Sequence, residues 1–305
     1  MKLLRTGLIF LGVVLFLSGC RRESDFLLTG YRKRNLVQDG KGNQYRIVFK
    51  ERVLYGSEIS VYRSTDGKGW ERVSRIPIPE HEVYEAWGYS LVSDGRNTFA
   101  LVYIGTGKGK KAVYFTKSLD NCNTWTEPVP VNEDVPAQRN YPVIAMEGKN
   151  IFVAWSEEKE TAVSGECRAS GIYFCSSNDG GENWGEDIRI GEGEDLSIGV
   201  GPDGTIWLVY VGGERKNIIF LSCSKDRGKN WHTETTGELP VMVREPHIIF
   251  AGRTIYLIFQ GASPAVFRPL EYHVFYLKSE DGGKSWSKII RIKEKEVDDL
   301  SLIHI

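Results

Sequence analysis

The sequence predicts an all-β fold, a β-propeller of four-stranded blades, from three observations. A short motif that begins with Ser-x-Asp and ends in Trp recurs five times. The motif aspartates are 54, 59, 47 and 55 residues apart, a spacing typical of propellers and repeat arrays. The segments between motifs are rich in Val, Ile, Tyr and Phe and are bounded by Gly, Asp and Asn turns, which indicates strands.

Each repeat has the same order of segments. An apolar segment is followed by a turn such as Asp39-Gly40 or Asp203-Gly204, and then by a strongly β-forming run such as 205–211. An alternating segment such as 171–177, the motif and a short final strand complete the unit. One four-stranded sheet cannot bury both of its faces, whereas sheets stacked around an axis can. We therefore expect blades at about 31–80, 85–132, 138–191, 194–241 and 243–293.

The segment after the fifth repeat resembles the start of another blade. Asp298–Ile305 reads DDLSLIHI, similar to EDLSIGV at Glu194–Val200, the first strand of the fourth blade. The sequence thus predicts five complete repeats plus the first strand of a sixth. Two arrangements are consistent with it: a six-bladed ring, if the chain is truncated, or a five-bladed ring in which the last strand has another role.

The motif itself is expected to hold a turn between the third and fourth strands. Its Asp accepts hydrogen bonds from turn amides, its Gly takes positive φ, and its Trp packs between neighbouring sheets. A calcium or catalytic role is the alternative, but a catalytic motif is not normally repeated five times. The second copy departs from the pattern, with Cys122 where three others have Gly. The structural residues are Asp66, Asp120, Asp179, Asp226 and Asp281, with Trp70, Trp125, Trp184, Trp231 and Trp286.

The pattern S-x-D-x-G-x-x-W resembles the Asp box, or BNR repeat, of sialidases (neuraminidases) and other propellers. The likeness extends over nearly the whole chain after its first thirty residues. It implies a propeller that acts on glycans, with six blades as in sialidases. Since the boxes of that family lie away from its active site, the site has to be sought elsewhere.

The starts of the first strands are the expected location, because the innermost strands of a propeller converge on a central opening where ligands bind. The candidate catalytic residues at these positions are Arg34, Tyr89, Arg139, Asp195, Arg244 and Glu245. The resemblance implies that the three arginines clamp a substrate carboxylate and that Tyr89 is the nucleophile. It further implies that Glu245 takes the proton of Tyr89 and that Asp195 is the general acid and base.

The sequence departs from the family at three of these places. The acid–base Asp has no counterpart near the first blade, so Asp195 would have to serve from the fourth. The family's first Arg lies in an F/Y-R-I-P motif, whereas Tyr31–Asn35 contains no Ile-Pro. The family places its nucleophilic Tyr in the last blade, whereas Tyr89 belongs to the second. We therefore keep two hypotheses: a glycan-acting protein, including an exo-sialidase that releases terminal sialic acid, and a non-catalytic propeller that serves as a binding or assembly scaffold.

Composition limits the partners. A formal net charge of −1 argues against nucleic-acid binding. The five histidines show no ligand spacing, so we expect neither a metal nor another cofactor. A glycan or glycoconjugate is the expected ligand, and a monomer is the expected state.

The N-terminus predicts export and lipid anchoring. Lys2 and Arg5 precede an apolar run at 8–17 that is too short to span a membrane as a mature helix. Leu17-Ser18-Gly19-Cys20 resembles the lipobox of bacterial lipoproteins, which implies removal of residues 1–19 and lipidation of Cys20. An ordinary signal peptide or an uncleaved anchor is the alternative. Residues 20–30 would be a linker and 31–305 the propeller, held in the cell envelope, at the outer membrane if the cell is Gram-negative.

Four further cysteines remain, and export permits disulfides. Cys167–Cys175 is the expected pair, with buried thiols as the alternative.

Overall fold

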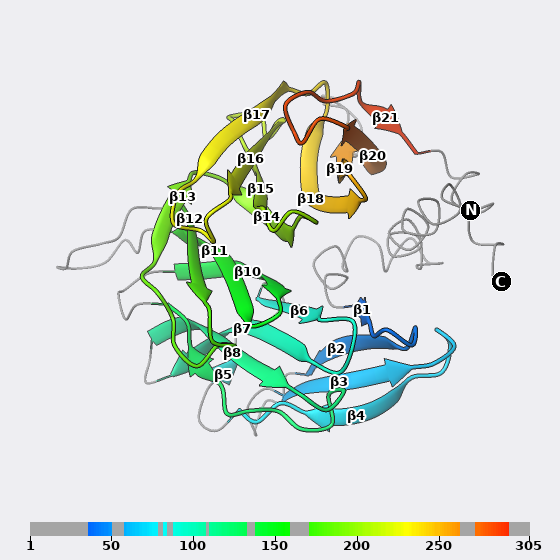
Figure 1. Cartoon of the computed structure of the whole chain (residues 1–305), viewed down its shortest axis with the longest axis vertical. Helices are drawn as coiled ribbons and strands as arrows, with labels where there is room; N and C mark the ends of the chain where they lie inside the picture. Colours follow the sequence, from blue (N-terminus) through cyan, green and yellow to red (C-terminus); the bar gives the residue numbers. More distant parts are fainter. Residues whose placement is uncertain are drawn as a thin grey trace. The chain divides into compact units, whose positions relative to one another are not determined.

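A computed structural model describes residues 36–50, 58–78, 82–83, 88–107, 110–132, 138–158, 171–262 and 272–292 (Figure 1). The fold is an all-β propeller fold with five blades, each an antiparallel sheet in which chain neighbours pair. The predicted blade boundaries are confirmed to within a few residues. The segments 1–35 and 293–305, which hold the predicted signal peptide, Cys20, Arg34 and the sixth-blade strand, lie outside the described residues.

The strands follow the chain from blade A to blade E. Blade A contains β1 (Leu36–Gln38), β2 (Gln44–Lys50), β3 (Glu58–Ser64) and β4 (Glu71–Arg75). Blade B contains β5 (Glu82–Val83), β6 (Tyr89–Ser93), β7 (Phe99–Gly107), β8 (Lys110–Ser118) and β9 (Val129–Pro130). Blade C contains β10 (Gln138–Glu147), β11 (Asn150–Glu158), β12 (Gly171–Ser177) and β13 (Ile188–Gly191). Blade D contains β14 (Glu194–Val200), β15 (Ile206–Gly212), β16 (Ile218–Ser224) and β17 (His232–Glu238). Blade E contains β18 (Met242–Ala251), β19 (Thr254–Ala262), β20 (Tyr272–Ser279) and β21 (Ile290–Arg291).

The blades group into two compact units. Blades A, B and C, together with the motif segment Asp226–Asn230, form the A–C unit, and the rest of blades D and E form the D–E unit.

Stacked sheets explain why the middle strands are apolar on both faces. In β7, Phe99, Leu101 and Tyr103 pack into the core between blades A and B. The alternate residues Ala100, Val102 and Ile104 pack into the core between blades B and C. This division follows from the two-residue side-chain period of a strand. The outermost strand β17 is exposed along most of its length because no sheet covers it.

Cys175 lies on an inward face of β12, buried in the core between blades B and C, and its Sγ donates to the carbonyl oxygen of Gly185 at 3.1 Å. It serves as a small apolar residue there. The predicted Cys167–Cys175 disulfide stays a prediction, because Cys167 lies outside the described residues.

Candidate functional site

The innermost strands of blades C, D and E carry a bulge at the same place. Pairing jumps between Asn140 and Val143 in β10, between Glu194 and Ser197 in β14, and between Arg244 and His247 in β18. In each case the inner strand has one residue more than its partner. A bulge re-aims side chains and is over-represented beside active sites.

Each bulge places a residue other than glycine in the left-handed region. The φ angles are 53° at Tyr141, 52° at Asp195 and 48° at Glu245. Such residues carry backbone strain that the surrounding fold has to hold. Asp195 and Glu245 are both predicted site residues, and Tyr141 follows the predicted Arg139 by two positions. Three of the seven non-glycine residues with positive φ in the described part of the chain therefore lie at or beside predicted site residues.

The inner edge of blade B is also interrupted. β5 pairs with Gly105 and Thr106, while β6 pairs with residues 99–103, and between them the carbonyl of Gly88 accepts the amide of Ile104 at 2.7 Å. An ideal Cβ at Gly88 would lie 2.7 Å from Ile104 Cγ1, so only glycine allows this approach. Tyr89, the predicted nucleophile, begins β6 directly after it and is half-buried.

Two buried acids, Asp195 and Glu245, are linked in the D–E unit by one hydrogen bond. The carboxylate oxygen Oδ2 of Asp195 accepts the backbone amide of Glu245 at 3.3 Å, and Oε2 of Glu245 accepts Nε2 of Gln260 at 3.0 Å. The residues are 4% and 9% exposed, which is unusual for acids. The two bulges thus bring Asp195 of blade D against the bulge of blade E that carries Glu245.

Arg244 lies next to this pair in the chain. Its side chain is exposed, and its Cζ lies 4.8 Å from the ring centroid of Tyr272, at the start of β20. This is within the range of a cation–π contact. The D–E unit therefore combines two buried acids, one exposed guanidinium and a tyrosine ring near the starts of its inner strands.

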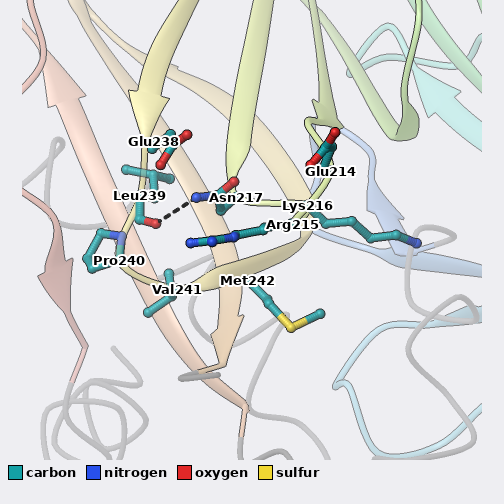
Figure 2. Close-up of a pocket in the computed structure, with 9 residues that line it drawn as sticks. All are labelled: Glu214, Arg215, Lys216, Asn217, Glu238, Leu239, Pro240, Val241 and Met242. Carbon is teal, nitrogen blue, oxygen red and sulfur yellow. Dashed lines mark hydrogen bonds between the residues drawn. The ribbon is translucent and has the colours of Figure 1, made fainter. Parts of the chain in front are cut away.

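A pocket of about 720 Å³ opens at the same end of blade D (Figure 2). It lies between the β15–β16 loop and the link from β17 to β18. Leu239 donates to the carbonyl of Asn217 at 2.8 Å, and Val243 donates to the carbonyl of Lys216 at 2.7 Å, so the loop and the link are tied together. Figure 2 shows Arg215 extending from the loop toward the link. The lining residues are Glu214, Arg215, Lys216, Asn217, Glu238, Leu239, Pro240, Val241 and Met242.

Arg139 forms a different arrangement in the A–C unit. Its Nε donates to Oε1 of Glu157 at 3.1 Å, and its Nη1 donates to the carbonyl of Lys111 at 2.7 Å. The same Glu157 oxygen accepts Nε1 of Trp155 at 2.9 Å. The side chains of Arg139 and Glu157 are 2% and 1% exposed, so this is a buried ion pair between the first two strands of blade C.

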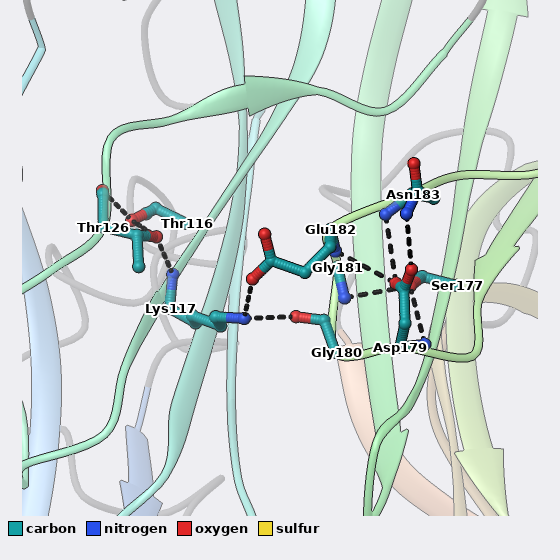
Figure 3. A network of polar contacts seen from close by, with 9 residues as sticks. All are labelled: Thr116, Lys117, Thr126, Ser177, Asp179, Gly180, Gly181, Glu182 and Asn183. Atoms are coloured by element: carbon teal, nitrogen blue, oxygen red, sulfur yellow. Dashed lines mark hydrogen bonds and ion pairs between the residues drawn. The ribbon is translucent and has the colours of Figure 1, made fainter.

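The repeat motifs hold turns through one set of contacts. In the third motif, Oδ1 of Asp179 accepts the hydroxyl of Ser177 at 2.7 Å and the amide of Asn183 at 3.0 Å (Figure 3). The hydrogen bonds from Asn183 and Ser177 lower the pKa of Asp179. The fifth motif repeats this with Ser279, Asp281 and Ser285, and there the pKa falls to about 2, chiefly through the Ser285 hydroxyl.

The structure thus brings together three of the six predicted catalytic residues, Asp195, Arg244 and Glu245. Arg139 and Tyr89 belong to the A–C unit, and Arg34 lies outside the described residues. Sequence reasoning missed Gln260 and Glu157, the polar partners of the site. Each could have been found as a polar residue that ends an apolar run: Gln260 in TIYLIFQ and Glu157 in NIFVAWSEE.

No group of three or more His, Cys, Asp or Glu residues in the described part of the chain is arranged to hold a metal ion. Within the same residues, no helix has the length and apolar character that crossing a membrane requires.

Comparison with known proteins adds the fold. No family model matches the sequence, and no curated protein does either. Among solved structures, the chain is similar to an alpha-L-arabinanase of Penicillium chrysogenum complexed with arabinobiose, with 15% identity over 83% of this chain and 78% of that one and a TM-score of 0.55. A Dyadobacter fermentans protein of unknown function gives 15% identity over 85% and 82%, with a TM-score of 0.56. The GH93 alpha-L-arabinofuranosidase of Fusarium graminearum, complexed with arabinobiose, gives 16% identity over 76% and 71%, with a TM-score of 0.53. At these identities the likeness establishes the shared propeller fold.

Proposed function

We propose that this protein is a glycan-acting propeller, a glycoside hydrolase in which Asp195 and Glu245 supply the carboxylate chemistry. One observation carries the proposal: two acids from different blades are held almost fully buried and in contact, each on a strained left-handed bulge. A fold maintains strain of this kind when it positions functional groups. The similarity to arabinan-degrading enzymes supports a glycan as the ligand.

The chemistry of glycosidic cleavage suits such a pair. One carboxyl group protonates the leaving oxygen while the other acts as base or nucleophile at the anomeric carbon. Asp195 is assigned the acid–base role, as the sequence predicted. Glu245 is fixed by the Gln260 amide, which holds one of its oxygens and orients the other. Neighbouring Arg244 is exposed and can contact the substrate.

Exo-sialidase activity is the finer form of this proposal. It rests on the exposed Arg244, held over Tyr272, because a guanidinium suits a substrate carboxylate. In this form Arg244 binds the substrate carboxylate within the D–E unit, whereas the buried pair of Arg139 with Glu157 removes Arg139 from the predicted clamp. Turnover of a charged sugar would distinguish the exo-sialidase form from a hydrolase that acts on neutral sugars.

The test is turnover of fluorogenic glycosides by the purified full chain, using an α-sialoside, an α-L-arabinofuranoside and a β-galactoside. Asp195→Asn and Glu245→Gln keep the size of each side chain and should each lower kcat by about 10²–10⁴-fold. Arg244→Ala should abolish turnover of the sialoside selectively. Asp94→Asn, at an exposed turn of blade B, is the matched control and should leave turnover unchanged.

Equal turnover by wild type and both carboxamide variants would overturn the assignment of Asp195 and Glu245. No turnover from a folded chain on any glycoside would favour the scaffold hypothesis. Binding of partner proteins from the cell envelope would then be measured instead.

We propose in addition that the protein is exported and anchored to the cell envelope through Cys20. The support is the lipobox-like sequence before that cysteine. Cys20→Ser should move the protein from the membrane fraction to the soluble fraction without changing its turnover. Unchanged membrane association in the variant would contradict the lipid anchor.

A further inference from the structure

A second cavity, of about 930 Å³, lies between blades D and E at their turn end. Blade D contributes the β14–β15 turn and parts of β15, β16 and β17. Blade E contributes the β18–β19 turn and the fifth motif. By the rise of a strand, the six residues from Asp195 to Gly201 put this cavity roughly 20 Å from the carboxylate pair.

Blade D lacks an aromatic residue that blades B and C carry beside their motifs. An ideal Cβ at Gly181 would lie 2.2 Å from Phe115, and one at Gly228 would lie 2.2 Å from Phe174. Both phenylalanines stand three residues before a motif serine, and each fills the space beneath the next motif. The equivalent residue of blade D is Leu221.

A different aromatic residue takes over part of this contact. An ideal Cβ at Gly283 would lie 2.5 Å from Cη2 of Trp207, which comes from β15 rather than from β16. Trp207 of β15 therefore packs beneath the fifth motif, whereas the phenylalanines of blades B and C do so from the third strand of their blades. Leu221 and Cys223 of β16, with His232 and Glu234 of β17, line the cavity beside it.

The residue directly before the motif serine also differs between blades. In blade B it is Lys117, whose Nζ reaches the carbonyl of Gly180 at 2.9 Å and Oε1 of Glu182 at 2.6 Å (Figure 3). In blade D it is Cys223, which is too short to bridge in this way, as is Ser176 in blade C. Cys223 lines the cavity.

The lining suits an uncharged polar ligand. Its apolar part consists of Trp207, Leu221, Cys223, Phe250 and Ile255. Its rim carries four acids and three basic residues, namely Asp203, Glu234, Glu280 and Asp281 with Lys225, Arg253 and Lys284. Charges of both signs in near balance do not favour a strongly charged ligand. An apolar wall with hydrogen-bonding groups around it fits a sugar ring, which has C–H groups on its faces and hydroxyls at its edge.

We propose that this cavity is a second carbohydrate-binding site, for one or two neutral sugar rings, separate from the carboxylate pair. Such a site would hold a glycan chain on the protein independently of any cleavage. It does not require Asp195 or Glu245 to be catalytic.

Cys223 provides the readout. It is half-buried in the cavity wall, whereas the other described cysteines, Cys122 and Cys175, are buried. Labelling of Cys223 by iodoacetamide in the full chain is followed by peptide mass spectrometry, which distinguishes it from every other cysteine. The probes are arabinobiose, lactose and maltose, with 3′-sialyllactose as the charged comparison. At a concentration of about ten times its Kd, a neutral disaccharide should slow labelling about tenfold.

Leu221→Phe restores the residue that blades B and C carry at this position. It should remove the protection by disaccharides while the melting temperature stays equal or rises. Leu221→Met keeps the side-chain volume and should keep the protection. Arg253→Ala, at the exposed rim, should weaken protection several-fold without altering the packing.

Three outcomes would overturn the proposal. The first is that none of the three neutral disaccharides slows labelling of Cys223 in the wild type. The second is that only 3′-sialyllactose slows it. The third is that Cys223 remains fully protected in Leu221→Phe. Turnover of the fluorogenic glycosides should be the same in Leu221→Phe as in the wild type. This separates failure of the second site from failure of the proposed function.

Discussion

The two ends of the blades differ in how faithfully they repeat. At the turn end, the motifs of blades B, C and E share one design, in which Asp accepts a Ser hydroxyl and a later backbone amide. At the other end, the inner strands share a bulge in blades C, D and E but carry different side chains on it. Blade C holds a buried ion pair beside its bulge, whereas blades D and E hold two acids.

This difference separates architecture from function. Contacts that recur in blade after blade are needed to build each blade, so they say little about chemistry. A backbone feature that recurs with changing side chains is a scaffold on which specific groups are displayed. The inner-strand ends therefore carry the proposed hydrolytic site. The cavity between blades D and E lies at the turn end, where blade D departs from blades B and C at Leu221, and it carries the proposed second site.

The largest expected effect comes from breaking the buried pair of blade C. Glu157→Leu leaves the guanidinium of Arg139 buried without its carboxylate, and should lower the free energy of unfolding by about 3–5 kcal/mol. Urea denaturation measures it. The exposed pair Arg63–Glu71 is the control, and Glu71→Gln should cost less than about 1 kcal/mol. An equal loss in the free energy of unfolding at both sites would mean that the buried Arg139–Glu157 pair matters no more for stability than an exposed pair.

A smaller loss is expected at the turn end. Gly181→Ala would place a Cβ 2.2 Å from Phe115 at a φ of 89°, and should cost about 2–4 kcal/mol through overpacking and backbone strain. Gly148→Ala is the matched control: its φ is 59° and nothing lies within 4 Å, so about 1 kcal/mol is expected. Thermal unfolding of the two variants side by side tests this, and the prediction fails if Gly148→Ala is the less stable.

The strain of the bulge can be measured by one pair of variants. Glu245→Gly and Glu245→Ala both remove the carboxylate, but only glycine accepts a φ of 48° without strain. The glycine variant should be more stable than the alanine variant by about 1 kcal/mol, the reverse of the usual order in a strand. Denaturant unfolding gives the difference. If the alanine variant is the more stable of the two, the backbone at Glu245 is not strained and strain no longer supports this site.

The smallest effect concerns acid stability of the motifs. The folded-state pKa of Asp281 is about 2, below its ordinary value of 3.8. Its contribution to stability is therefore fully present above about pH 4 and is lost as the pH falls through 2. Thermal melts over this range should show a steeper loss of stability in the wild type than in Asp281→Asn. Identical slopes would show that the motif hydrogen bonds do not depend on the charge.

Much of the turn end could be predicted from the sequence, because its geometry is local. Ser177, Asp179 and Asn183 lie within seven residues of one another, so their hydrogen bonds need no distant partner. The departure at Cys122 was visible in the sequence, but its reason was not. Cys122 has a φ of 65° and packs into the same core as Val61. Val61 holds the position in blade A that phenylalanine holds in blades B and C, so the next motif does not need a glycine there.

The sequence by itself determined five repeats, their order and the starts of the inner strands as places to search, and it left open whether the ring has five or six blades. Period, turn residues and strand propensity are properties of neighbouring residues, so each of the five repeats carries them. Only the tertiary structure decided that Arg139 pairs with Glu157, that Asp195 accepts the amide of Glu245, and that a cavity lies beside Leu221. Those results depend on residues that are brought together from different strands and blades, and a one-residue bulge reverses which face each side chain occupies.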